Sequence, residues 1–173
     1  MLRSVFAASI LVATATLIAG GKKSSDLVLH DLSGKKVQLR DYRGKVVVLN
    51  FWATWCAPCR EEMPMIVEAE KTWAAKGVTF IAISLDSSKT KKNIPSFIEL
   101  YHVDFPVWSG ASVDDLDKLR MGQGVPDTAF LDEDGVVVAR VLGEIRRGEL
   151  DERLVWLTGD RKSAPPSALI SHL

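Results

Sequence analysis

The two cysteines of the chain, Cys56 and Cys59, lie three positions apart in the stretch WATWCAPCREE. Residues 45–53, just before them, form a continuous apolar and β-branched run that predicts a strand buried on both faces. Apolar residues then recur at mostly helical spacing over residues 57–76. The pair is therefore expected at a strand-to-helix junction, on the carboxyl edge of a sheet where α/β proteins place their sites.

The spacing of this pair suits reversible redox chemistry. At a helix start, unpaired amides and the positive end of the helix dipole favour a thiolate at Cys56, and a thiolate is the species that attacks a disulfide. Cys59, one turn further along, is placed to attack the mixed disulfide on Cys56 and release the product. A purely structural bridge is a poor explanation, because closing a ring of four residues restrains the unfolded chain very little.

Other uses of a Cys-x-x-Cys pair fit the sequence less well. Structural zinc generally needs four Cys or His ligands, and the histidines His30, His102 and His172 are scattered singly. Covalent haem attachment needs a histidine directly after the second cysteine, where the chain has Arg60. We therefore expect no metal and no cofactor. The zero net charge and dispersed basic residues also argue against nucleic acid as a partner.

Around this pair the sequence predicts one α/β domain over residues 27–159. The expected order is hairpin, β, α, β, α, short α, β, β, α, with the hairpin turn at Ser33-Gly34, a second buried strand over 78–86, helices beginning near Pro95 and Ser112, strands over 128–131 and 136–142, and a closing amphipathic helix. Strands separated by helices imply a parallel portion of sheet, and the closing hairpin adds an antiparallel edge. The prediction is a mixed central sheet flanked by helices, with an N-terminal β-hairpin.

The two ends of the chain have different compositions. Residues 1–21 carry Arg3 and then an uncharged apolar run, which predicts a signal for export. A cleaved signal peptide and an uncleaved membrane anchor are both compatible with its length, whereas a lipid anchor is not expected because no cysteine follows Gly20. We expect a periplasmic protein, either soluble or tethered to the inner membrane by this segment. Residues 160–173 are polar and contain prolines, which predicts a flexible tail.

Several motifs together resemble the thioredoxin superfamily. They are WCAPC after a buried strand, Pro64 five residues past the second cysteine, and Gly-Val-Pro before a strand. The segment DLSGKKVQLRDYRGKVVVLNFWATWCAPCREEMP narrows the resemblance to the exported thiol-disulfide proteins typified by TlpA, ResA and CcmG, over roughly residues 27–159. The resemblance implies a thioredoxin-like fold, with Cys56 as nucleophile and Cys59 as the buried resolving thiol.

The same resemblance implies a substrate-binding surface. Pro126 would be a cis-proline, and the backbone of the preceding Val125 would pair with a substrate segment; by spacing alone, the bond could equally be trans. Trp55 resembles the tryptophan that borders the active-site surface in the family. Pro58, between the cysteines, is placed with these residues.

A further implied residue is Glu62, which matches the acidic residue of ResA-like members and would handle the proton of Cys59. By spacing alone it could also be a solvated glutamate in the first turns of a helix, favoured by the dipole. Thioredoxins proper carry a buried aspartate six positions before the first cysteine, and here that position is Asn50. Since asparagine is not a base at neutral pH, any assisted proton transfer falls to Glu62 or to water.

The direction of electron flow is predicted from the residues between the cysteines. Ala57-Pro58 is closer to the Gly-Pro of reducing thioredoxins than to the Pro-His of the oxidant DsbA. We therefore expect a reductase of exported protein disulfides, such as those of apocytochromes c or copper-site proteins, supplied by a membrane electron donor of the DsbD type.

Two alternatives remain open at this stage. One is a copper(I) metallochaperone that holds the ion with Cys56 and Cys59, since thiolates suit that ion. The other is a peroxidase, because DLSGKKVQLRDYRGK also resembles peroxiredoxins. Peroxiredoxins need a threonine three residues before the reactive cysteine, however, and the chain has Ala53 there.

Overall fold

The computed structural model describes residues 26–172, so the predicted export signal over 1–21 lies outside the described residues. Within them, no helix is long and apolar enough to cross a membrane. The strands are β1 (Val28–Asp31), β2 (Lys36–Gln38), β3 (Val47–Trp52), β4 (Thr79–Ser84), β5 (Val107–Ser109), β6 (Asp127–Leu131), β7 (Val137–Leu142) and β8 (Leu169–Ser171). The helices are α1 (Ala57–Ala74), α2 (Ile94–Tyr101), α3 (Val113–Lys118) and α4 (Arg147–Thr158), with short 3-10 turns η1 (Leu39–Tyr42) and η2 (Lys91–Asn93).

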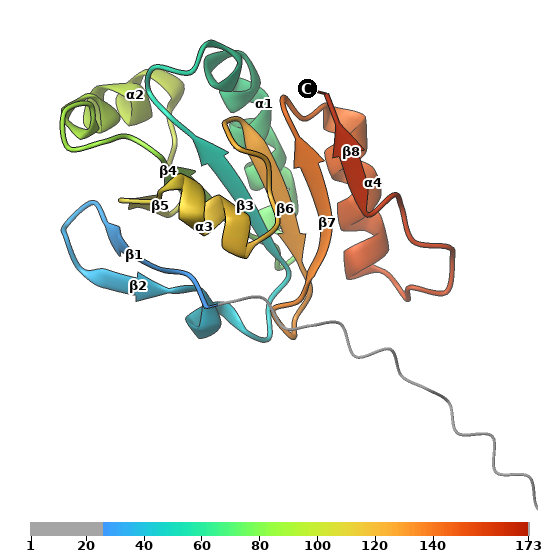
Figure 1. Cartoon of the computed structure of the whole chain (residues 1–173). Helices are drawn as coiled ribbons and strands as arrows, with labels where there is room; N and C mark the ends of the chain where they lie inside the picture. The colour runs from blue at the N-terminus through green and yellow to red at the C-terminus, as the bar shows by residue number, and fades with distance from the viewer. Residues whose placement is uncertain (1–25, 173) are drawn as a thin grey trace, which may run out of the picture.

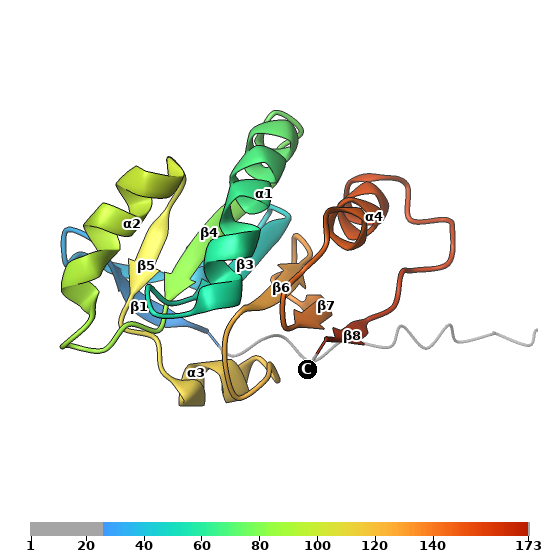
Figure 2. The same cartoon turned by 90° about the horizontal axis from the view of Figure 1, so that it is seen from above.

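The strands form one mixed sheet in the order β2-β1-β5-β4-β3-β6-β7-β8 (Figure 1). β3 is parallel to β4 and antiparallel to β6, so the predicted parallel portion and the predicted antiparallel edge meet at this strand. Seen from above, helices α1, α2 and α4 cover one face of the sheet and α3 covers the other (Figure 2). The predicted mixed sheet flanked by helices, with an N-terminal hairpin formed by β1 and β2, is confirmed.

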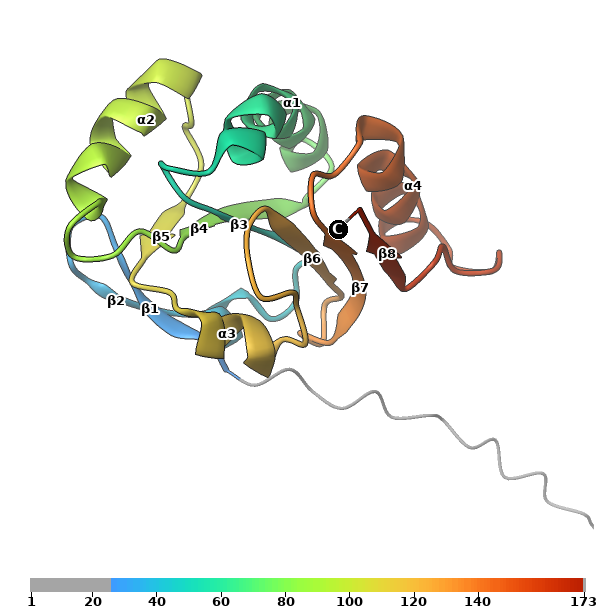
Figure 3. The same cartoon turned by 45° about the horizontal axis from the view of Figure 1, so that its top comes forward.

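The central position of β3 follows from its composition. All six of its residues are buried, as expected for a strand with helices on both faces. Val48 and Trp52 pack into the core under α1, α2 and α4, whereas Leu49 and Phe51 pack into a second core on the α3 side. Figure 3 shows α1 between α2 and α4 on the same side of the sheet. The loop after β3 therefore continues from a strand that packs into a core on each face of the sheet.

The sequence does not predict two of the strands. β5 and β8 are only three residues long, too short for an alternating pattern to be recognised. β8 also corrects the expectation of a flexible tail over residues 160–173, because it extends the sheet by pairing in parallel with β7. The imidazole Nε2 of His172, at the end of this segment, lies 2.9 Å from the carboxylate of Glu149 on α4, within hydrogen-bond distance.

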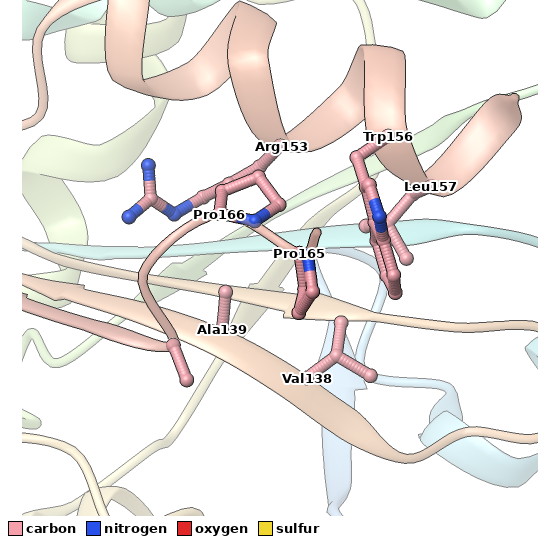
Figure 4. Close-up of a pocket in the computed structure, with 8 residues that line it drawn as sticks. Val138, Ala139, Arg153, Trp156, Leu157, Pro165 and Pro166 are labelled. Atoms are coloured by element: carbon pink, nitrogen blue, oxygen red, sulfur yellow. The ribbon is translucent and has the colours of Figure 1, made fainter. Parts of the chain in front are cut away.

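The prolines of the C-terminal segment pack against the rest of the protein, although proline is common in flexible tails. Figure 4 shows Pro165 and Pro166 facing α4 and β7 across a cavity of about 130 Å³, lined by Val138, Ala139, Arg153, Trp156, Leu157 and Ala168. The indole of Trp156 donates to the carbonyl of Ser163, and the guanidinium of Arg153 donates to that of Ser167. These contacts satisfy the backbone of a segment whose composition alone resembles a disordered tail.

Candidate redox site

The cysteine pair lies at the N-terminus of α1, as the sequence predicts. Cys56 is the N-cap residue, with extended backbone angles, and Ala57 and Pro58 open the first turn. The two cysteines form a disulfide with their Cα atoms 5.3 Å apart. The backbone N–H of Cys59 points to Cys56 Sγ at 3.2 Å, so a negative charge on that sulfur is stabilised at the helix start.

The two cysteine residues differ slightly in exposure. Cys59 is fully buried, whereas Cys56 keeps 4% of its surface. The small exposure of Cys56 and the full burial of Cys59 are compatible with the nucleophile and resolving roles that the resemblance implies. Among residues 26–172, no group of three or more His, Cys, Asp and Glu side chains is arranged to hold a metal ion.

The loop before Cys56 is fixed by a carboxylate from the neighbouring strand end. Asp86 follows β4 and accepts hydrogen bonds from the backbone N–H of Thr54 at 2.9 Å and from its hydroxyl at 2.6 Å. The hydroxyl of Ser84 donates to the same carboxylate at 2.8 Å. Nothing in the sequence pattern identifies this contact, because the residues are more than thirty positions apart and meet only through the pairing of β3 with β4.

The residues of the implied substrate-binding surface come together around Cys56. The Val125–Pro126 peptide bond is cis, in agreement with the resemblance. The carbonyl oxygen of Val125 lies 3.5 Å from Cys56 Sγ, so an extended client segment can pair with this backbone beside the reactive sulfur. Trp55 is 58% exposed and Pro58 is also exposed, which leaves both available to a partner.

Asp127, directly after Pro126, is a supporting residue that the sequence reasoning missed. It is buried, and its carboxylate accepts from the backbone N–H of Gly122 at 2.7 Å and from that of Gly143 at 3.0 Å. Burial raises the pKa of this carboxyl, while the two backbone hydrogen bonds lower it. Asp127 therefore ties the approach to Pro126 to the turn after β7.

This contact explains the first glycine of the Gly-Gln-Gly sequence before Val125. A Cβ at position 122 would lie 2.9 Å from Asp127 Oδ2, closer than real Cβ atoms approach, and the carboxylate is held by its two donors. We expect Gly122→Ala to lower the free energy of unfolding by roughly 1–3 kcal/mol, as overpacking against a buried side chain does. Gly124→Ala is the matched control, because no atom lies within 4 Å of its added Cβ. Urea titration of both variants tests the prediction, and equal midpoints would contradict it.

Glu62 is buried inside the protein rather than solvated on the first turns of the helix. It is 2% exposed and lies one helical turn beyond Cys59 on α1. Burial raises the pKa of its carboxyl from 4.5 to about 7, and the nearby carboxylates of Glu144 and Asp127 add to the rise. Glu62 can therefore exchange a proton near neutral pH, as a general acid or base must.

Two donors hold the carboxylate of Glu62 in place. Asn50 Nδ2 donates to Oε1 at 2.7 Å, and the backbone N–H of Ile145 donates to Oε2 at 3.0 Å. Asn50 Nδ2 also donates to the hydroxyl of Thr128 at 3.2 Å. Asn50 and Thr128 are directly opposite each other on β3 and β6, so this network depends on strand register.

Comparison of the sequence with known proteins identifies the family of the chain. The model of the AhpC/TSA family matches residues 21–140. The chain belongs to the AhpC/TSA family. Among curated relatives, the thiol-disulfide oxidoreductase ResA of Bacillus thuringiensis subsp. konkukian is 38% identical over 141 residues, covering 80% of this chain and 78% of the relative.

Solved structures of other proteins have the same fold as this chain. A Chlorobium tepidum structure described as thiol:disulfide interchange protein DsbE matches with a TM-score of 0.71 and 27% identity, covering 80% of this chain and 97% of the other. A thiol:disulfide interchange protein of the thioredoxin family from Chlorobium tepidum TLS matches with a TM-score of 0.68 and 25% identity, covering 82% and 99%. The predicted thioredoxin-like fold is confirmed. With these relatives and the Cys56–Cys59 pair, the chain is a thiol-disulfide oxidoreductase.

Proposed function

We propose that the protein reduces disulfides of other exported proteins, in the periplasm. The observation that carries the proposal is the geometry at Cys56, whose sulfur caps α1 and faces the carbonyl of Val125 beside the exposed Trp55. This arrangement offers an extended client backbone a hydrogen-bonding partner next to Cys56, the more exposed of the two cysteines. The uncharged apolar run within residues 1–21 supports the exported setting.

The proposed reaction begins with the dithiol form. The thiolate of Cys56 attacks one sulfur of the client disulfide, forming a mixed disulfide and releasing the other client sulfur as a thiolate that takes a proton. Cys59 then loses its proton and attacks Cys56 Sγ. This closes the Cys56–Cys59 disulfide and releases the second client thiol. Two electrons have passed from the protein to the client.

Glu62 is proposed to accept the proton of Cys59. Cys59 is fully buried, so water reaches it poorly, whereas Glu62 lies one turn further along the same helix and has a pKa raised to about 7. A carboxylate with that pKa can take a proton from a thiol and later return it to solvent at neutral pH.

The direction of electron flow is supported by Ala57 and Pro58, which resemble the Gly-Pro of reducing thioredoxins. The clients that fit an exported reductase are apocytochromes c and copper-site proteins. A membrane electron donor of the DsbD type is the proposed source of the two electrons that restore the dithiol. The N-terminal segment is proposed to direct export and either to be removed or to tether the protein to the inner membrane.

The equilibrium reduction potential of the Cys56–Cys59 pair tests the direction. We expect a value near that of thioredoxin, roughly −270 mV or lower, on titration against dithiothreitol or glutathione buffers. A value near that of DsbA, roughly −120 mV, would instead indicate an oxidant of client thiols. A peroxide-consumption assay separates this function from the peroxidases that the family name suggests, and Ala53, in place of their threonine, leads us to expect no appreciable turnover.

A further inference from the structure

The side-chain amide of Asn50 is hydrogen-bonded on one side only. Its Nδ2 uses both protons, donating to Glu62 Oε1 at 2.7 Å and to Thr128 Oγ1 at 3.2 Å. Its Oδ1 faces the other way, is buried, and has no hydrogen-bond partner among residues 26–172. A buried acceptor without a donor destabilises a folded protein, so this orientation needs a reason.

The observed orientation suits the ionised form of Glu62 best. Both oxygens of its carboxylate accept hydrogen bonds, from Asn50 Nδ2 and from the backbone N–H of Ile145. A protonated carboxyl carries an O–H that needs an acceptor, and neither of these groups accepts. When Glu62 binds a proton, neither of these groups can accept its O–H, and an exchange of donor for acceptor at Asn50 would supply that acceptor.

A turn of the Asn50 amide by about 180° about its last side-chain bond exchanges Oδ1 with Nδ2 and removes this conflict. Oδ1 has two lone pairs, which can accept from the O–H of Glu62 and from the hydroxyl of Thr128, since a hydroxyl donates as well as accepts. The number of hydrogen bonds is unchanged. One end of the amide lacks a partner in either orientation, so the protonation of Glu62 decides between them.

We propose that Asn50 is a positioning residue whose amide reorients each time Glu62 gains or loses a proton. The purpose of this movement rests on the proposed function. As Cys59 gives its proton to the Glu62 carboxylate, the amide of Asn50 changes from donor to acceptor, and it turns back when Glu62 releases that proton to water. An aspartate at position 50 would bring a second buried carboxylate to the site instead of a group that can either donate or accept.

Other titratable groups also face this site, and the effect of their titration must be distinguished from that of Glu62. Asp127 at the start of β6 and Glu144 in the turn after β7 both raise the pKa of Glu62, while β3 itself has no titratable side chain. The pKa of Asp127 is also raised by burial. The experiment therefore has to show that the response of Asn50 follows Glu62 in particular.

Asparagine-selective ¹⁵N labelling of the full chain makes the amide directly visible by NMR. The sequence has two asparagines, Asn50 and the exposed Asn93, which serves as an internal control. The titration midpoint of Glu62 is the pH at which half of its carboxyl groups are ionised. In the disulfide form, we expect nuclear Overhauser contacts between the Asn50 Nδ2 protons and the Glu62 side chain at roughly two pH units above this midpoint. We expect these contacts to be lost at roughly two pH units below it. The signals of Asn93 should not follow that midpoint.

Two variants make the test decisive. In Glu62→Gln the Asn50 signals should become independent of pH; if they still titrate, another group such as Asp127 drives them and the proposal is wrong. In Asn50→Leu, of similar size, the titration midpoint of Glu62 should rise, because the hydrogen bond lost from the charged carboxylate is stronger than the one lost from the neutral carboxyl. An unchanged midpoint would mean that Asn50 only fills space.

If Asn50→Leu fails to fold, the measurement on the wild-type protein still tests the proposal. Contacts between the Nδ2 protons and Glu62 that persist at low pH would overturn the proposal. Because these measurements use the resting disulfide and need no client, they are independent of the outcome for the proposed reductase. An oxidising potential would change the proposed direction of electron flow but not the behaviour of the amide.

Discussion

Replacing Cys59 by serine is expected to convert the protein from a catalyst that turns over into one that stays covalently bound to its client. Cys56 keeps its place as N-cap and remains accessible, so the first attack still occurs. The mixed disulfide then lacks the buried thiol that resolves it. We expect turnover to fall by on the order of 10³-fold or more, because an external thiol replaces one held at a high effective concentration. Insulin reduction measures turnover, and mass spectrometry without reductant detects the adduct.

Cys56→Ser is the matched control for this experiment. It should abolish turnover and form no adduct, since Cys59 is fully buried and cannot reach a client disulfide. Adduct formation by Cys56→Ser, or undiminished turnover by Cys59→Ser, would reverse the assigned roles of the two sulfurs.

The parts of this site that the sequence predicts are those with a local signal. The run of six buried residues in β3 and the helical spacing after Ala57 predict the junction, and the junction gives Cys56 its chemistry. The short helix α3 is predicted from Ser112 and Asp115, and the Asp115 carboxylate does accept from the Ser112 backbone at 3.0 Å. Each of these features lies within one turn or one strand of chain.

The parts that the sequence does not predict depend on distant segments that meet in the fold. Asp86 fixes Thr54 through the pairing of β4 with β3, and Asp127 ties Gly122 to the turn after β7. Asn50 is recognisable in the sequence as a departure from thioredoxins. Its contact with Glu62 depends on how α1 lies over the sheet, and its contact with Thr128 depends on strand register, neither of which a single sequence reports.

The stability of the disulfide form is expected to fall as pH rises from about 4.5 to about 7, because Glu62 is buried. Its pKa is 4.5 ordinarily and about 7 in the folded protein. Between these values the folded state holds a proton that the unfolded state has released, so raising the pH favours unfolding. At about 1.4 kcal/mol per pH unit, the full effect is at most about 3.5 kcal/mol. It is absent below the lower value and complete above the higher one.

Glu62→Gln should remove this part of the pH dependence, because an amide does not titrate. Asn50 can still donate to the glutamine oxygen, while the glutamine NH₂ group faces the N–H of Ile145, at a cost that is the same at every pH. The informative quantity is therefore the slope of unfolding free energy against pH, from urea titrations of the oxidised protein. The neighbouring Glu61→Gln removes an exposed carboxyl from the same helix and should keep the wild-type slope. If Glu62→Gln also keeps that slope, the carboxyl of Glu62 does not titrate near neutral pH, and the proton of Cys59 must go to water.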